Sequence, residues 1–333
     1  MEDVIQLLLH NQLRSSSDGI RRQKPDHCKY PILGRPWEVQ QIPRGILSRQ
    51  RRKLMGTHLQ LIEIESISPT SIQLLVSRAN IFMFFLLQGE ISLRSQEQEQ
   101  IAAADQPSYQ LSYLPHAHYD LHIPAGYHAL LIITLDTGWP ISLQESYKEF
   151  VPLQIARDSQ PQKPLALPPH PIPKVVWRLL EKLRITIVKQ TEDSLQILAH
   201  ITHILNTYHQ NLAQENATLT KALAADAEEL QAYLAKHYMF SEACQLDFIS
   251  LKLSLSRWRI RQIAKEVFGC SLRQYLNKLR MEKAKQLLLT TDLPLHTICI
   301  QIGLSSVSSF SHTFLNYTNL RPVQYRQKHN LKA

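Results

Sequence analysis

The sequence has little glycine. Its 333 residues include only nine glycines, and these stand singly along the chain. Loops that bind nucleotide phosphates need clustered glycines, because their backbone N–H groups must approach the phosphates closely. Neither a GxGxxG nor a GxxxxGK pattern is present, which argues against a Rossmann dehydrogenase, a kinase and a P-loop ATPase.

Cysteine and long apolar runs are also scarce. The four cysteines are far apart and form no CxxC pair, which argues against a structural zinc site or a disulfide framework and suits a reducing compartment. The longest apolar stretches, 81–87 and 130–135, are much shorter than the ~20 residues that cross a bilayer. We therefore expect a cytoplasmic protein with no cofactor and no membrane partner.

Basic residues gather in two regions of the chain. The whole chain has a formal net charge of +9. Residues 239–333 alone carry +9, residues 14–53 carry +8 and residues 54–238 carry −6. A basic C-terminal segment beside an acidic middle suggests a polyanionic partner, most often a nucleic acid, although a merely soluble basic surface gives the same count.

The first half of the chain has the pattern of β-strands. Alternating or fully apolar runs occupy 58–65, 72–76, 81–87, 91–94, 109–114, 120–123 and 129–135, with Pro or Gly between most of them. Short runs at this spacing predict a small barrel or sandwich over residues 54–150. Residues 1–53 are predicted to begin with a helix over 4–13 and to continue as a loosely packed basic extension.

The middle of the chain changes from proline-rich to helical. Seven prolines between positions 152 and 173 predict a semi-rigid linker over residues 151–173. Apolar residues then recur at helical spacing, and predict helices over 174–190, 192–212 and 218–237. An apolar stripe on a helix must pack against either the strand-rich domain or a second copy of the chain. We therefore expect residues 174–237 to be a coupling or dimerisation region.

Residues 239–333 contain the same helical pattern twice. Ser256 stands at the N-cap of a helix predicted over 257–268, and Gly269 ends it. About fifty residues later a short helix is closed by Gly303, and Ser305 or Ser306 precedes a helix over 307–317. An uninterrupted helix over 272–289 joins the two patterns, which predicts two helix-turn-helix units with a rigid spacer.

The residues of this segment match a known family. The matching positions are Ser256, Ile260, Phe268, Gly269, Cys270, Ser271, Tyr275, Leu276, Arg280, Met281, Ala284, Leu287, Leu288, Ile298, Ile302, Gly303, Leu304, Ser305, Ser306, Ser308, Phe310, Thr313, Phe314, Arg321, Pro322, Tyr325 and Arg326. In this order and spacing, residues 239–330 resemble the C-terminal domain of the AraC/XylS family of bacterial transcription regulators. The sequence departs from the family where Ala264 replaces a usual Phe, His312 a frequent Arg, and Leu315 a common Lys.

The resemblance implies a fold and a function. The fold class is α+β and multidomain, with an N-terminal cupin-like β-barrel (54–150), a helical linker region and a C-terminal all-α domain with two helix-turn-helix motifs (239–333). The function is sequence-specific transcription regulation, modulated through the N-terminal sensor, without enzymatic activity. Double-stranded promoter DNA is the expected partner, and RNA polymerase, a small-molecule effector and a second copy of the chain are further candidates.

Polar side chains on the two recognition helices are the candidate DNA contacts. Arg261 can reach guanine, Gln262 adenine and Trp258 a thymine methyl group, whereas the other basic residues suit phosphates. Reading of the major groove by a helix uses the N-terminal half of that helix. In the second helix this half contains Val307 and Ser308, which are weak readers of bases, so we expect a weaker contact there. The predicted contacts are Arg257, Trp258, Arg259, Arg261, Gln262, Lys265, Ser306, Val307, Ser308, Ser311, His312 and Arg326.

The strand-rich region offers two further interpretations. Phe82, Phe84, Tyr113 and His118 are candidate linings of an effector pocket, although aromatic residues in strands are more often core. The HxH at 116–118, together with His122 and His128, suggests a cupin-type metal site, but the Glu that usually follows is absent. A cupin-type metal-dependent enzyme or ligand-binding protein with a basic helical tail is therefore the alternative function.

Overall fold

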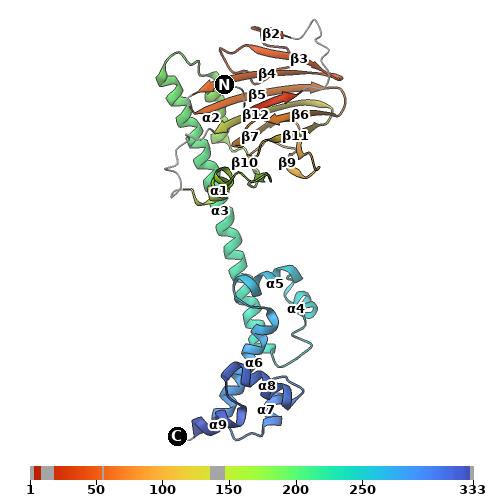
Figure 1. Cartoon of the computed structure of the whole chain (residues 1–333), viewed down its shortest axis with the longest axis vertical. Helices are drawn as coiled ribbons and strands as arrows, with labels where there is room; N and C mark the ends of the chain where they lie inside the picture. Colours follow the sequence, from red (N-terminus) through yellow and green to blue (C-terminus); the bar gives the residue numbers. More distant parts are fainter. Residues whose placement is uncertain (1–3, 9–18, 55, 136–146, 331–333) are drawn as a thin grey trace. The chain divides into compact units, whose positions relative to one another are not determined.

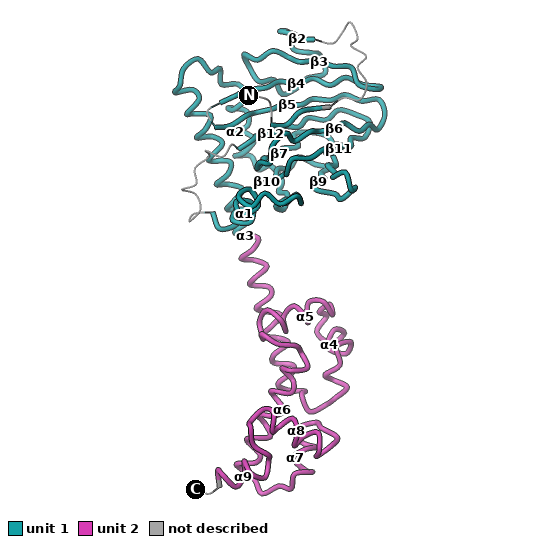
Figure 2. The backbone as a smooth tube through the Cα atoms, in the orientation of Figure 1, with its two compact units in different colours: residues 1–214 teal, residues 215–333 magenta. Residues whose placement is uncertain are grey.

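The computed structural model describes residues 4–8, 19–54, 56–135 and 147–330. The chain divides into two compact units, residues 1–214 and residues 215–333 (Figure 2). Each unit has hydrophobic cores built from its own residues.

Two antiparallel sheets form the first unit (Figure 1). The five-stranded sheet has the order β1 (Ile5–Leu8), β6 (Thr70–Val76), β11 (Ala117–Ile123), β8 (Ile91–Ser95) and β9 (Gln100–Ala104). The nine-stranded sheet contains β13 (Leu165–Ala166), β10 (Ser108–Leu114), β7 (Asn80–Gln88), β12 (Gly126–Leu135), β5 (Thr57–Ser66), β4 (Gly45–Leu54), β3 (Trp37–Ile42) and β2 (Gly19–Arg21), with β14 (His170–Pro171) also paired to β10. The strands predicted between 58 and 135 are confirmed.

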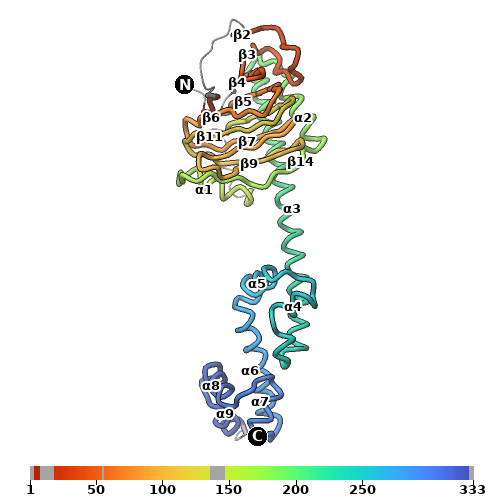
Figure 3. Tube along the Cα trace, turned by 90° about the vertical axis from the view of Figure 1, so that its right-hand side faces the viewer, coloured from red at the N-terminus to blue at the C-terminus, as the bar shows by residue number. Residues whose placement is uncertain are grey.

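The alternation of side chains along the strands produces two cores. In β7, Phe82, Phe84 and Leu86 pack between the two sheets, whereas the residues between them pack against helices. Those helices are α1 (Val151–Ser159), α2 (Lys174–Ile185) and the first part of α3 (Thr191–His237), and Figures 1 and 3 show α2 and α3 beside the strands. The unit thus has three layers: a five-stranded sheet, a nine-stranded sheet, and helices.

This arrangement confirms the predicted fold class but changes its details. The described strands form two separate sheets and do not close into one barrel. The loosely packed extension predicted for residues 1–53 is wrong where it is described, because β3 and β4 are integral strands and bury Trp37, Val39 and Leu47. The predicted helix over 4–13 is also wrong over its described part, since Ile5–Leu8 is a strand paired with β6; residues 9–13 lie outside the described residues.

The segment after the sheets is more structured than a linker. Residues 151–173 contain α1 and the short strands β13 and β14, which extend the nine-stranded sheet beside β10. The helices predicted at 192–212 and 218–237 are one continuous helix, α3. No Gly or Pro occurs between 191 and 237, so nothing in the sequence interrupts it.

The second unit is helical throughout its described residues. Beyond α3 it contains α4 (Leu246–Leu253), α5 (Arg257–Glu266), α6 (Leu272–Thr290), α7 (Leu295–Gln301), α8 (Val307–Thr318) and α9 (Pro322–Asn330). The predicted caps are present: Ser256 Oγ accepts from the Arg259 N–H at 3.1 Å, and Ser306 Oγ from the Ser309 N–H at 3.3 Å. Ser271 and Gln274 form a capping box at the start of α6.

Each helix-turn-helix pair has its own small core, and α6 contributes to both. Leu276 packs with α4, α5 and the end of α3, whereas Met281, Ala284 and Leu288 pack with α7 and α8. Because one rigid helix enters both cores, the distance between the two pairs is fixed by its length.

A close main-chain contact also joins the second helix-turn-helix turn to the end of α3. Gly303 has φ +76°, and a Cβ built on it would lie 2.2 Å from the carbonyl oxygen of Met239. Next to this contact, Arg280 Nε donates to the carbonyl oxygen of Tyr238 at 3.0 Å. Only glycine satisfies both the left-handed backbone and the close approach.

We therefore expect Gly303→Ala to destabilise the second unit strongly. A left-handed alanine costs ~1 kcal/mol, and the clash with the Met239 main chain should add at least ~2 kcal/mol. Gly269→Ala is the matched control, because Gly269 also has a positive φ (+67°) but has no atom within 4 Å of its built Cβ. Amide hydrogen exchange in α7 and α8 measures the effect, and equal exchange in the two variants would contradict the close-contact argument.

Candidate DNA-binding surface

Helix α5 has three faces with different environments. Ile260, Ile263 and Ala264 are buried and hold the helix against α3, α4 and α6. The remaining polar residues divide between a face exposed to solvent and a face directed to α3. This division separates the surroundings of the predicted contacts into two kinds.

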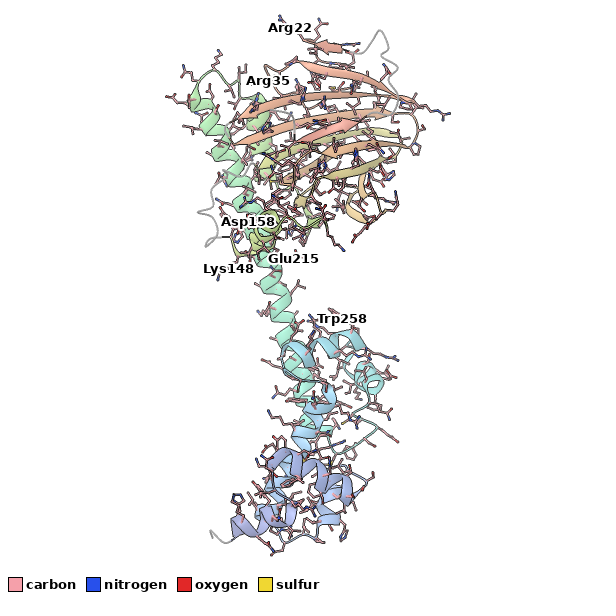
Figure 4. All side chains as sticks on the ribbon, in the orientation of Figure 1. Arg22, Arg35, Lys148, Asp158, Glu215 and Trp258 are labelled. Carbon is pink, nitrogen blue, oxygen red and sulfur yellow. The ribbon has the colours of Figure 1, made fainter. Side chains whose placement is uncertain are left out.

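The solvent-exposed face contains four of the predicted contacts. The Trp258 side chain is 69% exposed, which is unusual for a residue with so large an apolar surface (Figure 4). Arg261 and Lys265 follow it at helical spacing, are exposed, and have no hydrogen bond or ion pair with any described residue. Arg257 is exposed as well, but its Nε lies 2.5 Å from Asp247 Oδ1 in an ion pair.

The face directed to α3 holds the other two predicted contacts. Arg259 Nε donates to Asp226 Oδ2 at 2.7 Å, and Arg259 Nη1 donates to Gln262 Oε1 at 3.2 Å. Gln262 Nε2 in turn donates to the Glu266 carboxylate at 3.3 Å. The structure therefore places Arg259 and Gln262 in a network that holds α5 to α3.

Helix α8 presents a neutral surface. Val307, Ser308 and His312 are exposed, Ser311 is half-buried and Ser306 caps the helix. Residues 306–318 contain no Lys or Arg, so any reading by this helix depends on hydroxyl groups, the imidazole and apolar contact.

A hydrogen bond at the protein surface holds α8 against α6. Tyr317 Oη donates to Glu282 Oε1 at 2.7 Å. This hydrogen bond lowers the pKa of the Glu282 carboxyl, and burial together with the same bond raises the pKa of Tyr317 to about 12. Both groups thus keep the protonation states that the contact requires at neutral pH.

Two basic residues outside α5 have partners within the protein. Arg326 Nη2 donates to the carbonyl oxygen of Leu293 at 2.6 Å, and Lys285 Nζ lies 3.1 Å from Glu282 Oε2. Arg326 is half-buried and ties α9 to the turn after α6. The guanidinium group of Arg326 is therefore engaged by the protein's own main chain.

The four residues predicted to line an effector pocket do not converge. Phe82 and Phe84 lie between the sheets, whereas Tyr113 lies on the opposite face of the nine-stranded sheet and donates to Pro161 O at 3.1 Å. His118 alternates with buried Tyr119 on β11 and points away from the inter-sheet core. Phe84 is one of the residues that line an apolar space of about 30 Å³, which has room for one water molecule.

The histidines near the HxH pattern are also separated. His116 Nδ1 lies 2.8 Å from Val76 O, while His128 Nδ1 accepts from the Glu90 N–H at 3.0 Å. Burial lowers the pKa of His128, which favours the neutral ring that this acceptor role needs. Across the part of the chain that the structure describes, no three His, Cys, Asp or Glu side chains are grouped so that they could hold a metal ion. Within the same residues no helix has the length and apolar character to span a membrane.

Comparison with known protein families gives a match in the second unit. A family model described as a helix-turn-helix domain matches residues 249–328. A stretch of 141 residues, 41% of the chain, is 32% identical to an uncharacterized HTH-type transcriptional regulator, SAS0078, of Staphylococcus aureus strain MSSA476. The match spans only 18% of that regulator's length.

Two solved structures are also similar to this chain in sequence. The C-terminal domain of the two-component response regulator yesN from Fusobacterium nucleatum is 35% identical, over 33% of this chain and 98% of that domain, with a TM-score of 0.26. A transcriptional regulator with an AraC-type DNA-binding domain from Chromobacterium violaceum is 26% identical, over 34% of this chain and 96% of that chain, with a TM-score of 0.28. Residues 249–328 of the chain are therefore a helix-turn-helix domain of the AraC type, the kind found at the C-terminus of DNA-binding transcription regulators.

Proposed function

We propose that the protein regulates transcription by binding promoter DNA with α5 and α8, and that α5 supplies most of the base reading. The observation that carries this proposal is the exposed face of α5, where Trp258 and the unpaired Arg261 lie in the first two turns after the Ser256 cap and the unpaired Lys265 lies in the last turn. An arginine can donate two hydrogen bonds to guanine, and the indole ring offers apolar contact to a thymine methyl group. Ser306, Val307, Ser308, Ser311 and His312 belong to the weaker second reader.

The spacing of the two readers supports simultaneous binding. The 19 residues of α6 span about 28 Å at ~1.5 Å per residue. Successive major-groove segments on one face of DNA are ~34 Å apart, so the helix-turn-helix bodies at its two ends can supply the remainder. A monomer would then cover about two helical turns of DNA.

Modulation through the first unit is the second part of the proposal. What supports it is α3, because its residues up to Leu212 belong to the core of the first unit and those from Ala227 belong to a core of the second. A small molecule or protein that changes the packing of the first part of α3 would act on the helix that also anchors α5. RNA polymerase and a second copy of the chain are the further partners that we propose.

The base-reading role of α5 is tested with Arg261. On the best operator selected from random sequences by the wild-type protein, Arg261→Ala should lose ~1–3 kcal/mol of binding free energy and relax one base position. Arg261→Lys keeps the charge but not the two-bond geometry, so it should lose specificity while keeping the salt dependence. Equal losses on operator and random DNA in both variants would rule out base reading by Arg261.

Arg259 provides a contrast on the same helix. Because it pairs with Asp226, Arg259→Ala and Asp226→Ala should each lower stability and should share a coupling of about 0.5–1 kcal/mol in a double-mutant cycle. Their base preferences should match those of the wild type. A change of base preference in Arg259→Ala, without such coupling, would place Arg259 at the DNA instead.

The two half-sites should depend on sequence unequally. A footprint of the wild-type protein should cover about two turns of DNA, and systematic base changes should weaken binding in the half-site of α5 much more than in that of α8. The physical reason is the absence of any cation on α8. Protection of a single turn would contradict the two-reader arrangement, and equal base dependence would contradict the asymmetry.

A further inference from the structure

A groove lies between the two helix-turn-helix pairs of the second unit. Its volume is about 970 Å³, and it is lined by residues of α5, of the first half of α6 and of α8. Arg261 and Lys265 lie on its α5 wall, and Ser309 and Thr313 on its α8 wall. The groove thus extends from one recognition helix to the other.

The charge of the groove is of one sign. Four of its lining residues are Lys or Arg and none is Asp or Glu. Arg280 is engaged by the carbonyl oxygen of Tyr238, but Arg261, Lys265 and Arg273 have no hydrogen bond or ion pair with any described residue. Three unpaired cations around one groove repel one another, and an anion in the groove would remove that cost.

The start of α6 adds a second feature that favours an anion. Ser271 and Leu272, at its N-terminus, line the groove together with Arg273. The first-turn N–H groups of a 19-residue helix carry a partial positive charge, and the Ser271–Gln274 capping box satisfies only part of them. Hydroxyl groups of Ser309 and Thr313 offer further donors from the opposite wall.

We propose that this groove binds the DNA backbone between the two half-sites, with Arg273 and Lys265 as the phosphate contacts. This inference rests on the proposed function, since DNA that engages α5 and α8 together must pass its backbone across the space between them. The contact is independent of sequence, so it adds affinity and register without adding base preference. Arg273 is the new assignment, because no reading helix contains it.

The first experiment compares two neutralising substitutions on α6 in the full-length protein. Arg273→Gln should lower affinity about eightfold at ~0.1 M salt, equally on operator and random DNA, and should reduce the slope of log affinity against log salt by about 0.9. Lys278→Gln is the matched control, because Lys278 is an exposed cation on the same helix that does not line the groove. Thermal denaturation establishes that both variants fold.

The second experiment removes single charges from the DNA instead of from the protein. Single methylphosphonate substitutions, which remove one backbone charge, are scanned through the operator, and those between the half-sites should weaken the wild type but not Arg273→Gln. If Arg273→Gln and Lys278→Gln bind DNA equally well and the central substitutions have no effect, the assignment of the groove to the DNA backbone is wrong. Base reading by Arg261 is not contradicted by that result.

Two other outcomes are distinguishable. A wild-type protein that shows no sequence-specific binding would overturn the proposed function, and this inference with it. Decanoate tests a small amphipathic anion as the occupant, since apolar residues such as Leu246 and Leu276 also line the groove. Competition by decanoate with the wild type but not with Arg273→Gln, without any methylphosphonate effect, would overturn the assignment to DNA.

Discussion

The DNA-binding unit depends on the close approach of Gly303 to the main chain of Met239. Each helix-turn-helix pair takes part of its core from α6. A shared helix fixes the distance between the pairs but leaves rotation about its axis to be set by other contacts. The contact at Met239, together with the hydrogen bond from Arg280 to Tyr238, supplies that second constraint. With both in place, two recognition helices can meet DNA at one spacing and in one orientation.

The cations of this unit divide into those that hold the fold and those that remain available. Arg259, Arg280 and Arg326 each donate to an oxygen of another element, and the guanidinium group suits this role because its donors are fixed in one plane. Arg261 and Arg273 make no such contact within the described residues. Net charge alone therefore overstates the surface available to DNA, and the pairing of each cation defines it.

The sequence predicted most of the strands but missed β4 for a physical reason. Alternation of apolar and polar residues identifies a half-buried strand. This alternation is absent from β4 because Ser48, Gln50 and Arg52 are polar residues at buried positions. Gln50 Nε2 donates to Ile32 O at 3.1 Å, and Arg52 Nη1 donates to Leu183 O at 2.7 Å, at the end of α2. For Gln50 and Arg52 these main-chain carbonyls, one of them 131 residues away in sequence, offset part of the cost of burial. No local pattern contains such partners.

The candidate site shows the same limit at the scale of one helix. The period of 3.6 residues separates the buried residues Ile260, Ile263 and Ala264 of α5 from its polar residues, so the sequence predicts the helix and most of its core, although Val267 at the same spacing is exposed. It does not distinguish Arg261 from Arg259, since both are arginines on the polar side. The distinction comes from Asp226, 33 residues earlier on α3. A pairing of this kind becomes visible only when the packing of α5 on α3 is known.

The proposed modulation through the first unit depends on the continuity of α3. Residues 213–222 belong to neither core and are mostly exposed, so their helical state depends on intrinsic propensity rather than on packing. Thr218 and Thr220 are weak helix formers in this stretch, and Thr220 Oγ1 donates back to Asn216 O at 2.8 Å. Any change in the first unit that travels along the covalent chain must cross these ten residues. The stretch is therefore where a modest free energy, supplied by a ligand or a partner, can alter the helix that anchors α5.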